Sequence, residues 1–79
     1  MSELTFFARR LRELREGAGF TVVELARAAG LSRQGVYHLE SGQRLPSLST
    51  AFALAGALRV SVEAFNPAQP AEKKLPRKL

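Results

Sequence analysis

The sequence predicts an all-α domain of five short helices, followed by a disordered basic tail. Apolar residues recur at intervals of three and four along most of the chain, and no segment alternates with period two for long enough to form a strand. Glycine and hydroxyl residues separate one apolar run from the next, as expected for helix ends. Because the chain has 79 residues, it can hold only one hydrophobic core. We assign residues 1–66 to the folded domain and residues 67–79 to the tail.

The first predicted helix runs from Leu4 to Glu16 and is amphipathic. Ser2 is a candidate N-cap, and Gly17 and Gly19 are expected to end the helix. Charged residues separate the apolar positions, which are Leu4, Phe7, Leu11 and Leu14.

A second helix is expected over Val22–Ala29. Thr21 and Glu24 have the spacing of a capping box, in which the hydroxyl accepts from the third amide and the carboxylate bonds back. Gly30 ends this helix and suits the left-handed conformation of a tight turn. Ala26 is expected to be small because the next helix crosses it closely.

Three more helices complete the predicted domain. One runs from Arg33 to Glu40 after the N-cap Ser32, one from Ser49 to Leu58, and a short one starts at Ser61. The apolar residues of the last two are Phe52, Leu54, Ala55, Leu58, Val62 and Phe65. Nearly all Leu and Phe positions of the domain are predicted to be core, with Phe6, beside Phe7, as a candidate exposed residue.

Composition removes several classes of function from consideration. The chain has no Cys and one His, so we expect no disulfide scaffold, no metal site, no cofactor and no catalytic triad; the protein is not expected to be an enzyme. No apolar run approaches 18 residues and no secretory leader opens the chain, so a cytoplasmic protein without membrane contact is expected.

The net charge favours an anionic partner, nucleic acid first. Of the formal +5, residues 1–66 carry +2 and residues 67–79 carry +3. The tail has three interpretations: a solvated end, added attraction to DNA phosphates, or a segment that folds on a protein partner.

Two short helices joined at Gly30 have the outline of a helix-turn-helix, whose second helix would enter a major groove about 12 Å wide. Short motifs continue this pattern between Leu11 and Phe65. They are Leu14-Arg15-Glu16, Thr21 with Glu24-Leu25-Ala26, Gly30-Leu31-Ser32-Arg33-Gln34, Leu39-Glu40-Ser41-Gly42, Pro46-Ser47-Leu48, Leu54-Ala55 with Ala57-Leu58, and Val60-Ser61-Val62. In order and spacing they resemble the lambda-repressor-like, XRE-type helix-turn-helix DNA-binding proteins.

The resemblance implies a set of DNA-contacting residues. Those that would read base edges are Arg33, Gln34, Tyr37 and His38. Those that would contact phosphates are Thr21, Ser32, Ser41 and Arg44. Arg15 and Glu40 match a structural ion pair of the family. The sequence departs from the family pattern at Val22, where Gln is common, and at Arg59, where Gly is common; Gly35 also stands inside the recognition helix.

The leading hypothesis is a sequence-specific transcriptional regulator, of repressor type by its resemblance, that binds a two-fold related operator in double-stranded DNA as a homodimer. Val62 and Phe65 supply the apolar residues expected to serve dimerisation. The alternatives are an antitoxin, with a toxin bound through the tail or the Phe6 region, a restriction–modification controller, and a protein-binding adapter.

Overall fold

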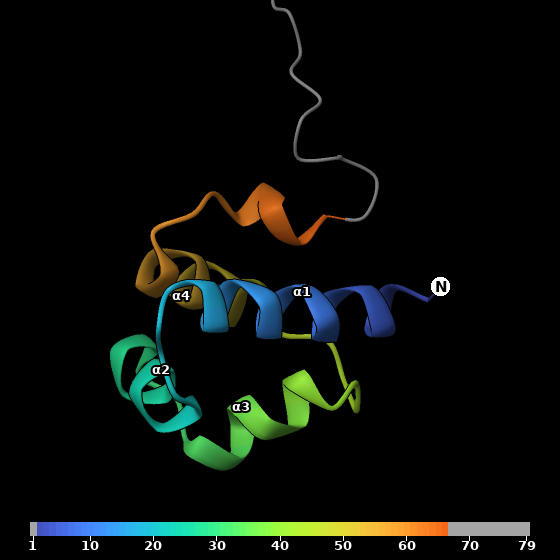
Figure 1. The fold of residues 1–79 in the computed structure, drawn as a ribbon. Helices are drawn as coiled ribbons and strands as arrows, with labels where there is room; N and C mark the ends of the chain where they lie inside the picture. The colour runs from blue at the N-terminus through green and yellow to red at the C-terminus, as the bar shows by residue number, and fades with distance from the viewer. Residues whose placement is uncertain (1, 67–79) are drawn as a thin grey trace, which may run out of the picture.

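The computed structural model describes residues 2–66, which fold into four α-helices and one 3₁₀ turn (Figure 1). The elements are α1 (Glu3–Gly17), α2 (Val22–Ala29), α3 (Arg33–Glu40), α4 (Leu48–Leu58) and the 3₁₀ turn η1 (Val62–Phe65). No strand is present between residues 2 and 66, in agreement with the all-α prediction. The predicted tail, residues 67–79, lies outside the described residues.

The prediction of a fifth α-helix after Ser61 was wrong, because Val62–Phe65 forms a single 3₁₀ turn. The N–H of Ala64 donates to the carbonyl of Ser61 at 2.9 Å, and only four residues separate the Ser61 cap from Asn66. Asn66 is extended, with φ −91° and ψ 113°. Since Pro67 follows it in the sequence, the helical conformation of Asn66 is disfavoured and the turn cannot lengthen.

Each α-helix begins at a hydroxyl residue that caps its first turn. The side chains of Ser2, Thr21, Ser32 and Ser47 accept from the amide three residues on, at 2.9–3.1 Å. At α2 the capping box is complete, because Glu24 also accepts from the Thr21 N–H at 2.9 Å. These bonds satisfy amides that would otherwise lack a partner inside the helix, and so the helix starts follow from the sequence.

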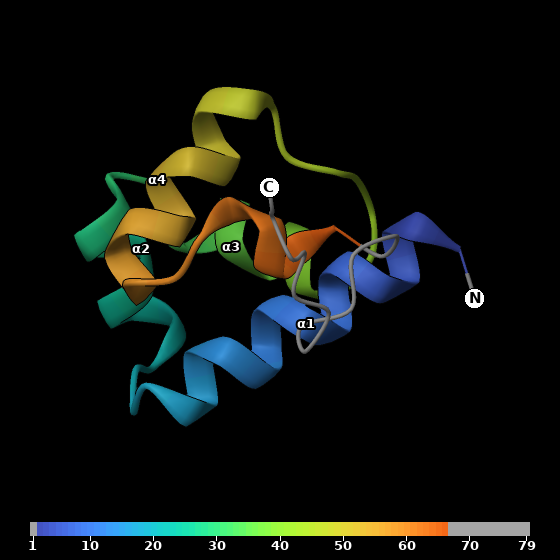
Figure 2. The same cartoon turned by 90° about the horizontal axis from the view of Figure 1, so that it is seen from above.

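The core lies where the helices meet, and four of its side chains are completely shielded from solvent: Leu11, Val36, Leu25 and Leu54. Around them lie Phe7, Ala26, Leu39, Ala55, Leu58 and Phe65. The Phe7 and Phe65 rings are 5.1 Å apart between centroids and pin η1 to α1. Figure 1 shows the result: α1 and α4 lie between η1 on one side of the molecule and α3 on the other. Figure 2, seen from above, has η1 in front of α3.

The prediction that Leu and Phe positions are core was wrong for Phe52, and also for Leu45 and Leu48, which are exposed. Phe52 is 55% exposed, because it shares the outer face of α4 with Leu48 and Gly56, four residues away on either side. Phe65 is buried and Val62 is half-buried against the core, so little of either side chain is left for contact with a second copy.

Candidate nucleic-acid interface

The turn between α2 and α3 fixes the position of the candidate recognition helix. Gly30 adopts the left-handed conformation, with φ 72° and ψ 30°, and the Leu31 N–H bonds the Ala26 carbonyl at 2.8 Å. Ala26 is buried in the same cluster as Val36 and Leu39, as a close crossing of the two helices requires. The predicted helix-turn-helix geometry is therefore present, and α3 has a fixed orientation relative to α2.

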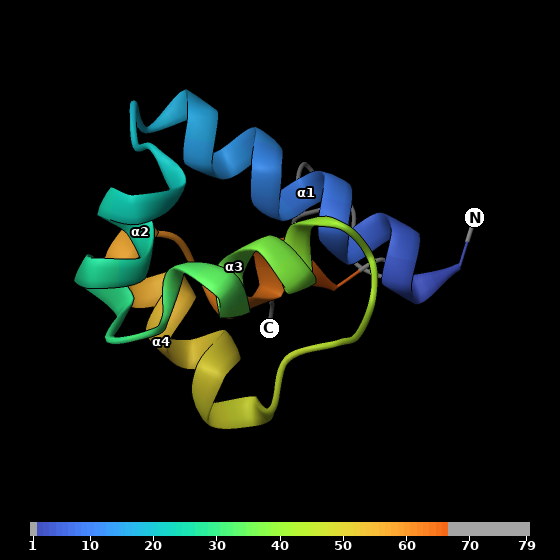
Figure 3. The same ribbon diagram turned by 90° about the horizontal axis from the view of Figure 1, so that it is seen from below.

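No other element of residues 2–66 covers the outer side of α3. Seen from below in Figure 3, α3 crosses the front of the molecule between α1 and α4. Arg33, Gln34 and Tyr37 are all exposed, Tyr37 by 54%, and together with Ser32 they line one shallow hollow. Within residues 2–66 none of these three side chains makes a hydrogen bond or ion pair, so their polar groups are free to bind a ligand.

His38 stands apart from the other three predicted base readers. It is half-buried, at the edge of the exposed face of α3, and it does not line the hollow that Arg33, Gln34 and Tyr37 share. The resemblance placed it with Tyr37, one turn after Arg33 and Gln34, whereas one step along a helix turns a side chain by about 100°.

The predicted phosphate-contacting residues lie at both ends of α3 and beside it. Thr21 and Ser32 are exposed N-caps, at the first turns of α2 and α3. Ser41 follows the C-terminal end of α3, and its hydroxyl donates to the His38 carbonyl at 3.1 Å. The structure therefore brings Ser32 close to the candidate base readers and places Ser41 at the far end of the helix. Val22, where the family commonly has Gln, packs against the core.

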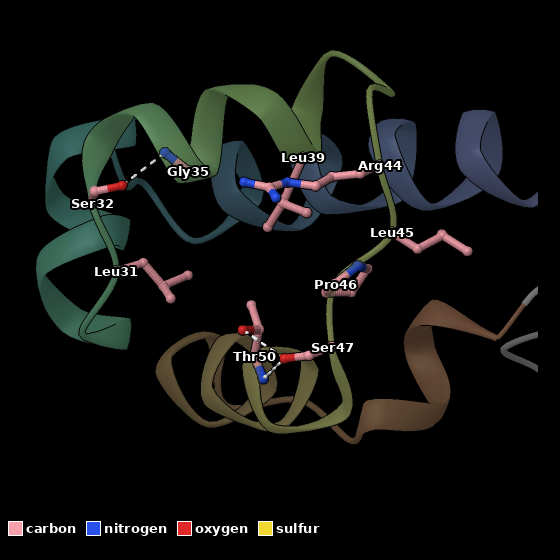
Figure 4. Close-up of a pocket in the computed structure, with 9 residues that line it drawn as sticks. All are labelled: Leu31, Ser32, Gly35, Leu39, Arg44, Leu45, Pro46, Ser47 and Thr50. Atoms are coloured by element: carbon pink, nitrogen blue, oxygen red, sulfur yellow. Dashed lines mark hydrogen bonds between the residues drawn. The ribbon is translucent and has the colours of Figure 1, made fainter.

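Arg44 projects into a hollow of about 310 Å³ between α3 and α4. Figure 4 shows its side chain extending from the loop beneath α3, with Ser32 and Gly35 at one end of the hollow and Ser47 and Thr50 across from them. Arg44 is exposed and makes no hydrogen bond or ion pair with other residues of the 2–66 segment. It is thus an unneutralised cation beside the candidate recognition helix.

The Arg15–Glu40 ion pair is present and ties α3 to α1. Arg15 Nε and Nη2 donate to the two Glu40 carboxylate oxygens at 2.7 and 3.1 Å, and Nη1 donates to the Phe20 carbonyl at 2.9 Å. The bond to Glu40 raises the pKa of Arg15, while burial opposes that rise. Glu40 is 8% exposed, so this pair holds the C-terminal end of α3 in place and does not face a ligand.

Two arginines that the sequence pattern left unassigned lie near the same end of α3. Arg9 and Arg12 of α1 line a hollow together with Ser41 and Gly42. Their spacing of three residues, which puts two side chains on one side of a helix, was the available signal. The resemblance begins at Leu11 and so does not include Arg9.

Phe6 is the residue that the sequence suggested, with the tail, as a contact for a protein partner. Phe6 is half-buried, and the Arg10 guanidinium lies over its ring, 5.2 Å from the centroid. The large apolar side chains that are exposed are instead Val23, Tyr37, Leu45, Leu48 and Phe52. Among residues 2–66 there is no cluster of His, Asp or Glu able to hold a metal ion, and no helix long and apolar enough to cross a membrane.

Comparison with known proteins agrees with this geometry. The helix-turn-helix family model HTH_3 matches residues 11–65. An HTH-type transcriptional regulator of Archaeoglobus fulgidus is 37% identical over 54 residues, which are 68% of this chain and 77% of that protein. An HTH-type transcriptional regulatory protein of Pyrococcus furiosus is 43% identical over 53 residues, which are 62% of this chain. The match covers only 17% of that second relative, so this chain spans a small part of its length.

A solved structure matches most of the chain as well. The crystal structure of the restriction–modification controller protein C.AhdI from Aeromonas hydrophila superimposes with a TM-score of 0.78 at 38% identity. The match covers 82% of this chain and 98% of that one. The chain belongs to the HTH_3 family of XRE-type, lambda-repressor-like helix-turn-helix DNA-binding domains, and it is a non-enzymatic HTH-type transcriptional regulator.

Proposed function

We propose that this protein regulates transcription in the cytoplasm by binding a two-fold related operator as a homodimer, with α3 of each copy in the major groove. The proposal depends on Arg33 and Gln34 in the first turn of α3. Their side chains are exposed, have no partner within residues 2–66, and lie on a face that no other described element covers. The eight residues of α3 span about 12 Å, which matches the width of the groove.

The chemistry of these side chains fits base recognition. A guanidinium pairs in the plane with O6 and N7 of guanine, and a carboxamide pairs with N6 and N7 of adenine. Arg33 and Gln34 are therefore proposed to read neighbouring base pairs, and Tyr37, one turn later on the same face, extends the contact. His38 is a weaker candidate because it is half-buried.

The phosphate contacts are proposed for Thr21, Ser32, Ser41 and Arg44. The hydroxyl groups of the two N-caps accept from backbone amides but retain a hydrogen to donate. Arg44 lies beside α3 with its charge unneutralised within residues 2–66. Such contacts would position α3 in the groove without reading the sequence.

For the dimer we propose the apolar surface formed by Leu45, Leu48 and Phe52. Leu48 is 71% exposed and lies one helical turn before Phe52, and Leu45 in the preceding loop is 45% exposed. The loop and the start of α4 lie beside α3 (Figure 3), so a second copy could pack there while both α3 helices face the same duplex. In sedimentation runs, Leu48→Ser/Phe52→Ser should lower the dimer fraction with the fold retained. A dimer fraction equal to that of the unchanged protein would exclude this surface.

Selection of bound sites from a random DNA pool tests the proposed function. Arg33→Ala should weaken binding to the best site by about 1–3 kcal/mol and flatten the preference at one position, and Gln34→Ala should do so at a neighbouring position. Arg44→Ala is the matched control, because losing a phosphate contact weakens all sequences alike. If both α3 variants keep the original sequence preference, α3 is not the reader, and a protein-binding adapter becomes the better hypothesis.

A restriction–modification controller is the second candidate. The similarity to C.AhdI favours it, because this chain covers 98% of that controller protein at 38% identity. An antitoxin of a toxin–antitoxin pair is the third candidate. The neighbouring gene distinguishes the two, since a restriction enzyme or methyltransferase gene supports the controller and a toxin gene supports the antitoxin.

A further inference from the structure

We propose that Arg9 and Arg12 of α1 form a second binding site for the DNA phosphodiester backbone, beside the C-terminal end of α3. The site is the hollow that these two side chains line together with Ser41 and Gly42. This inference rests on the proposed function, because it supposes that α3 meets a duplex.

The middle of α1 lies against the C-terminal end of α3. A carbon added at Gly42 would be 3.9 Å from the Ala8 side chain, and Arg12 Nε lies 3.7 Å from a Glu40 carboxylate oxygen. Figure 3 shows α1 running past this end of α3 on the side opposite α4. Arg9 and Arg12 therefore flank the candidate recognition helix on one side, whereas Arg44 flanks it on the other.

The acidic groups around this hollow are already paired with other arginines. Arg15 bonds both carboxylate oxygens of Glu40, and Arg10 lies 3.9 Å from Glu13, the second acidic residue that lines the hollow. Arg9 is exposed and makes no hydrogen bond or ion pair within residues 2–66. The Arg12 side chain is 59% exposed despite its contact with Glu40. The hollow therefore keeps an excess of positive charge.

The carbonyl groups at the end of α3 reduce this positive charge little, because most of them accept hydrogen bonds. The amides of Ser41, Gly42 and Gln43 donate to carbonyls of the last turn at 2.9–3.3 Å. The negative end of a short helix is further weakened when its carbonyls are satisfied in this way.

The length of α3 explains why a phosphate would be found here. Its eight residues span about 12 Å, the width of the major groove, so its two ends approach the two opposite backbones of the duplex. Thr21 and Ser32 at the N-terminal end would meet one strand. Arg9 and Arg12, whose side chains are long and flexible, would meet the other strand at the C-terminal end.

The salt dependence of binding to a mixed-sequence DNA duplex tests the proposal without knowledge of the operator. Each phosphate contact contributes about 0.9 to the slope of log affinity against log salt. Arg9→Gln should therefore bind more weakly than the unchanged protein, and the deficit should be about 3.5-fold larger at about 50 mM salt than at about 200 mM. Arg12→Gln should behave in the same way, and the double variant should show about a 12-fold change in its deficit.

Arg59→Asn is the matched control, because it removes one charge from the segment between α4 and η1, away from α3 (Figure 1). Asn also tolerates the left-handed conformation of this residue. The control should keep the original slope. An unchanged slope in Arg9→Gln, whose side chain has no partner to lose within the described residues, would overturn the proposal; so would an equal loss in Arg59→Asn.

Site selection from a random DNA pool distinguishes failure of the proposed function from failure of this second site. If the proposed function is wrong, the unchanged protein would select no sequence from the pool, whereas loss of this second site alone would leave the selected sequence intact. We expect Arg9→Gln and Arg12→Gln to select the same sequence as the unchanged protein, because backbone contacts carry no base information.

Discussion

Breaking the ion pair between Arg15 and Glu40 should lower the free energy of unfolding by about 3 kcal/mol. The Arg15 and Glu40 side chains are only 12% and 5% exposed, so water cannot solvate whichever charge remains. The perturbation is a set of three variants: Arg15→Met, Glu40→Met and the double variant. Met is chosen because it keeps apolar volume while it removes the charge.

The magnitude follows from the contacts. Glu40→Met loses two charge-assisted hydrogen bonds, at 2.7 and 3.1 Å, and Arg15→Met loses the same two together with the bond to the Phe20 carbonyl at 2.9 Å. Such bonds contribute about 1.5–3 kcal/mol each. Part of the lost free energy is recovered in each variant. In Arg15→Met, Arg12 still lies 3.7 Å from Glu40, and in Glu40→Met the Phe20 carbonyl still accepts from Arg15. The double variant strands no charge, so its cost should fall below the sum of the single costs by about 2 kcal/mol.

Urea unfolding followed by circular dichroism supplies the double-mutant cycle. A coupling energy within about 0.5 kcal/mol of zero would refute the reasoning, because it would mean that the pair behaves like an exposed one. The raised pKa of Arg15 sets the sign of the pH dependence. A raised folded-state pKa stabilises the fold at every pH below the ordinary pKa of arginine, and this contribution is lost only as the pH rises above it. Arg15 should therefore cause no loss of stability between about pH 7 and 10.

Three further predictions concern the backbone and the tail. Arg59 adopts φ 60° at the end of α4, so Arg59→Gly should raise the unfolding free energy by about 0.5–1 kcal/mol in urea; a loss of stability would contradict this. A carbon at Gly35 would lie 3.0 Å from Ser32 Oγ, so Gly35→Ala should gain its helix-propensity benefit of about 0.5–1 kcal/mol only in a Ser32→Ala background, as measured by thermal unfolding. Equal gains in both backgrounds would show that the cap accommodates the methyl group. Truncation after Asn66 should leave the unfolding midpoint unchanged and remove up to about four counterions from the salt slope, and an unchanged slope would assign the tail to solubility or to a protein partner.

The sequence predicted the parts of the fold that local chemistry determines. Helix starts follow from hydroxyl side chains that satisfy the first amides, as at Thr21 and Ser32, and the turn follows from Gly30. The Arg15–Glu40 pair was predicted through resemblance, because nothing in the local sequence relates two residues 25 positions apart.

The parts that sequence could not predict depend on packing between helices. Apolar residues occupy most positions of α4, so their periodicity does not indicate which face turns inward. The contacts of α4 with α2 and η1 determine which face of α4 is buried, and they leave Phe52 exposed. Likewise, only the crossing of α1 and α3 brings Arg9 near Ser41.

The position of η1 has a practical consequence for measurement. Because the Phe7–Phe65 contact fixes this turn on the side of the molecule opposite α3, a fluorophore or surface anchor attached beyond Asn66 would start away from the proposed reading face. An anchor at residue 2 is less suitable, because α1 begins there and carries Arg9 and Arg12 within its first three turns. Immobilisation through the C-terminal side therefore leaves the protein oriented for duplex capture, and each of the binding assays above can be carried out on a sensor surface in that orientation.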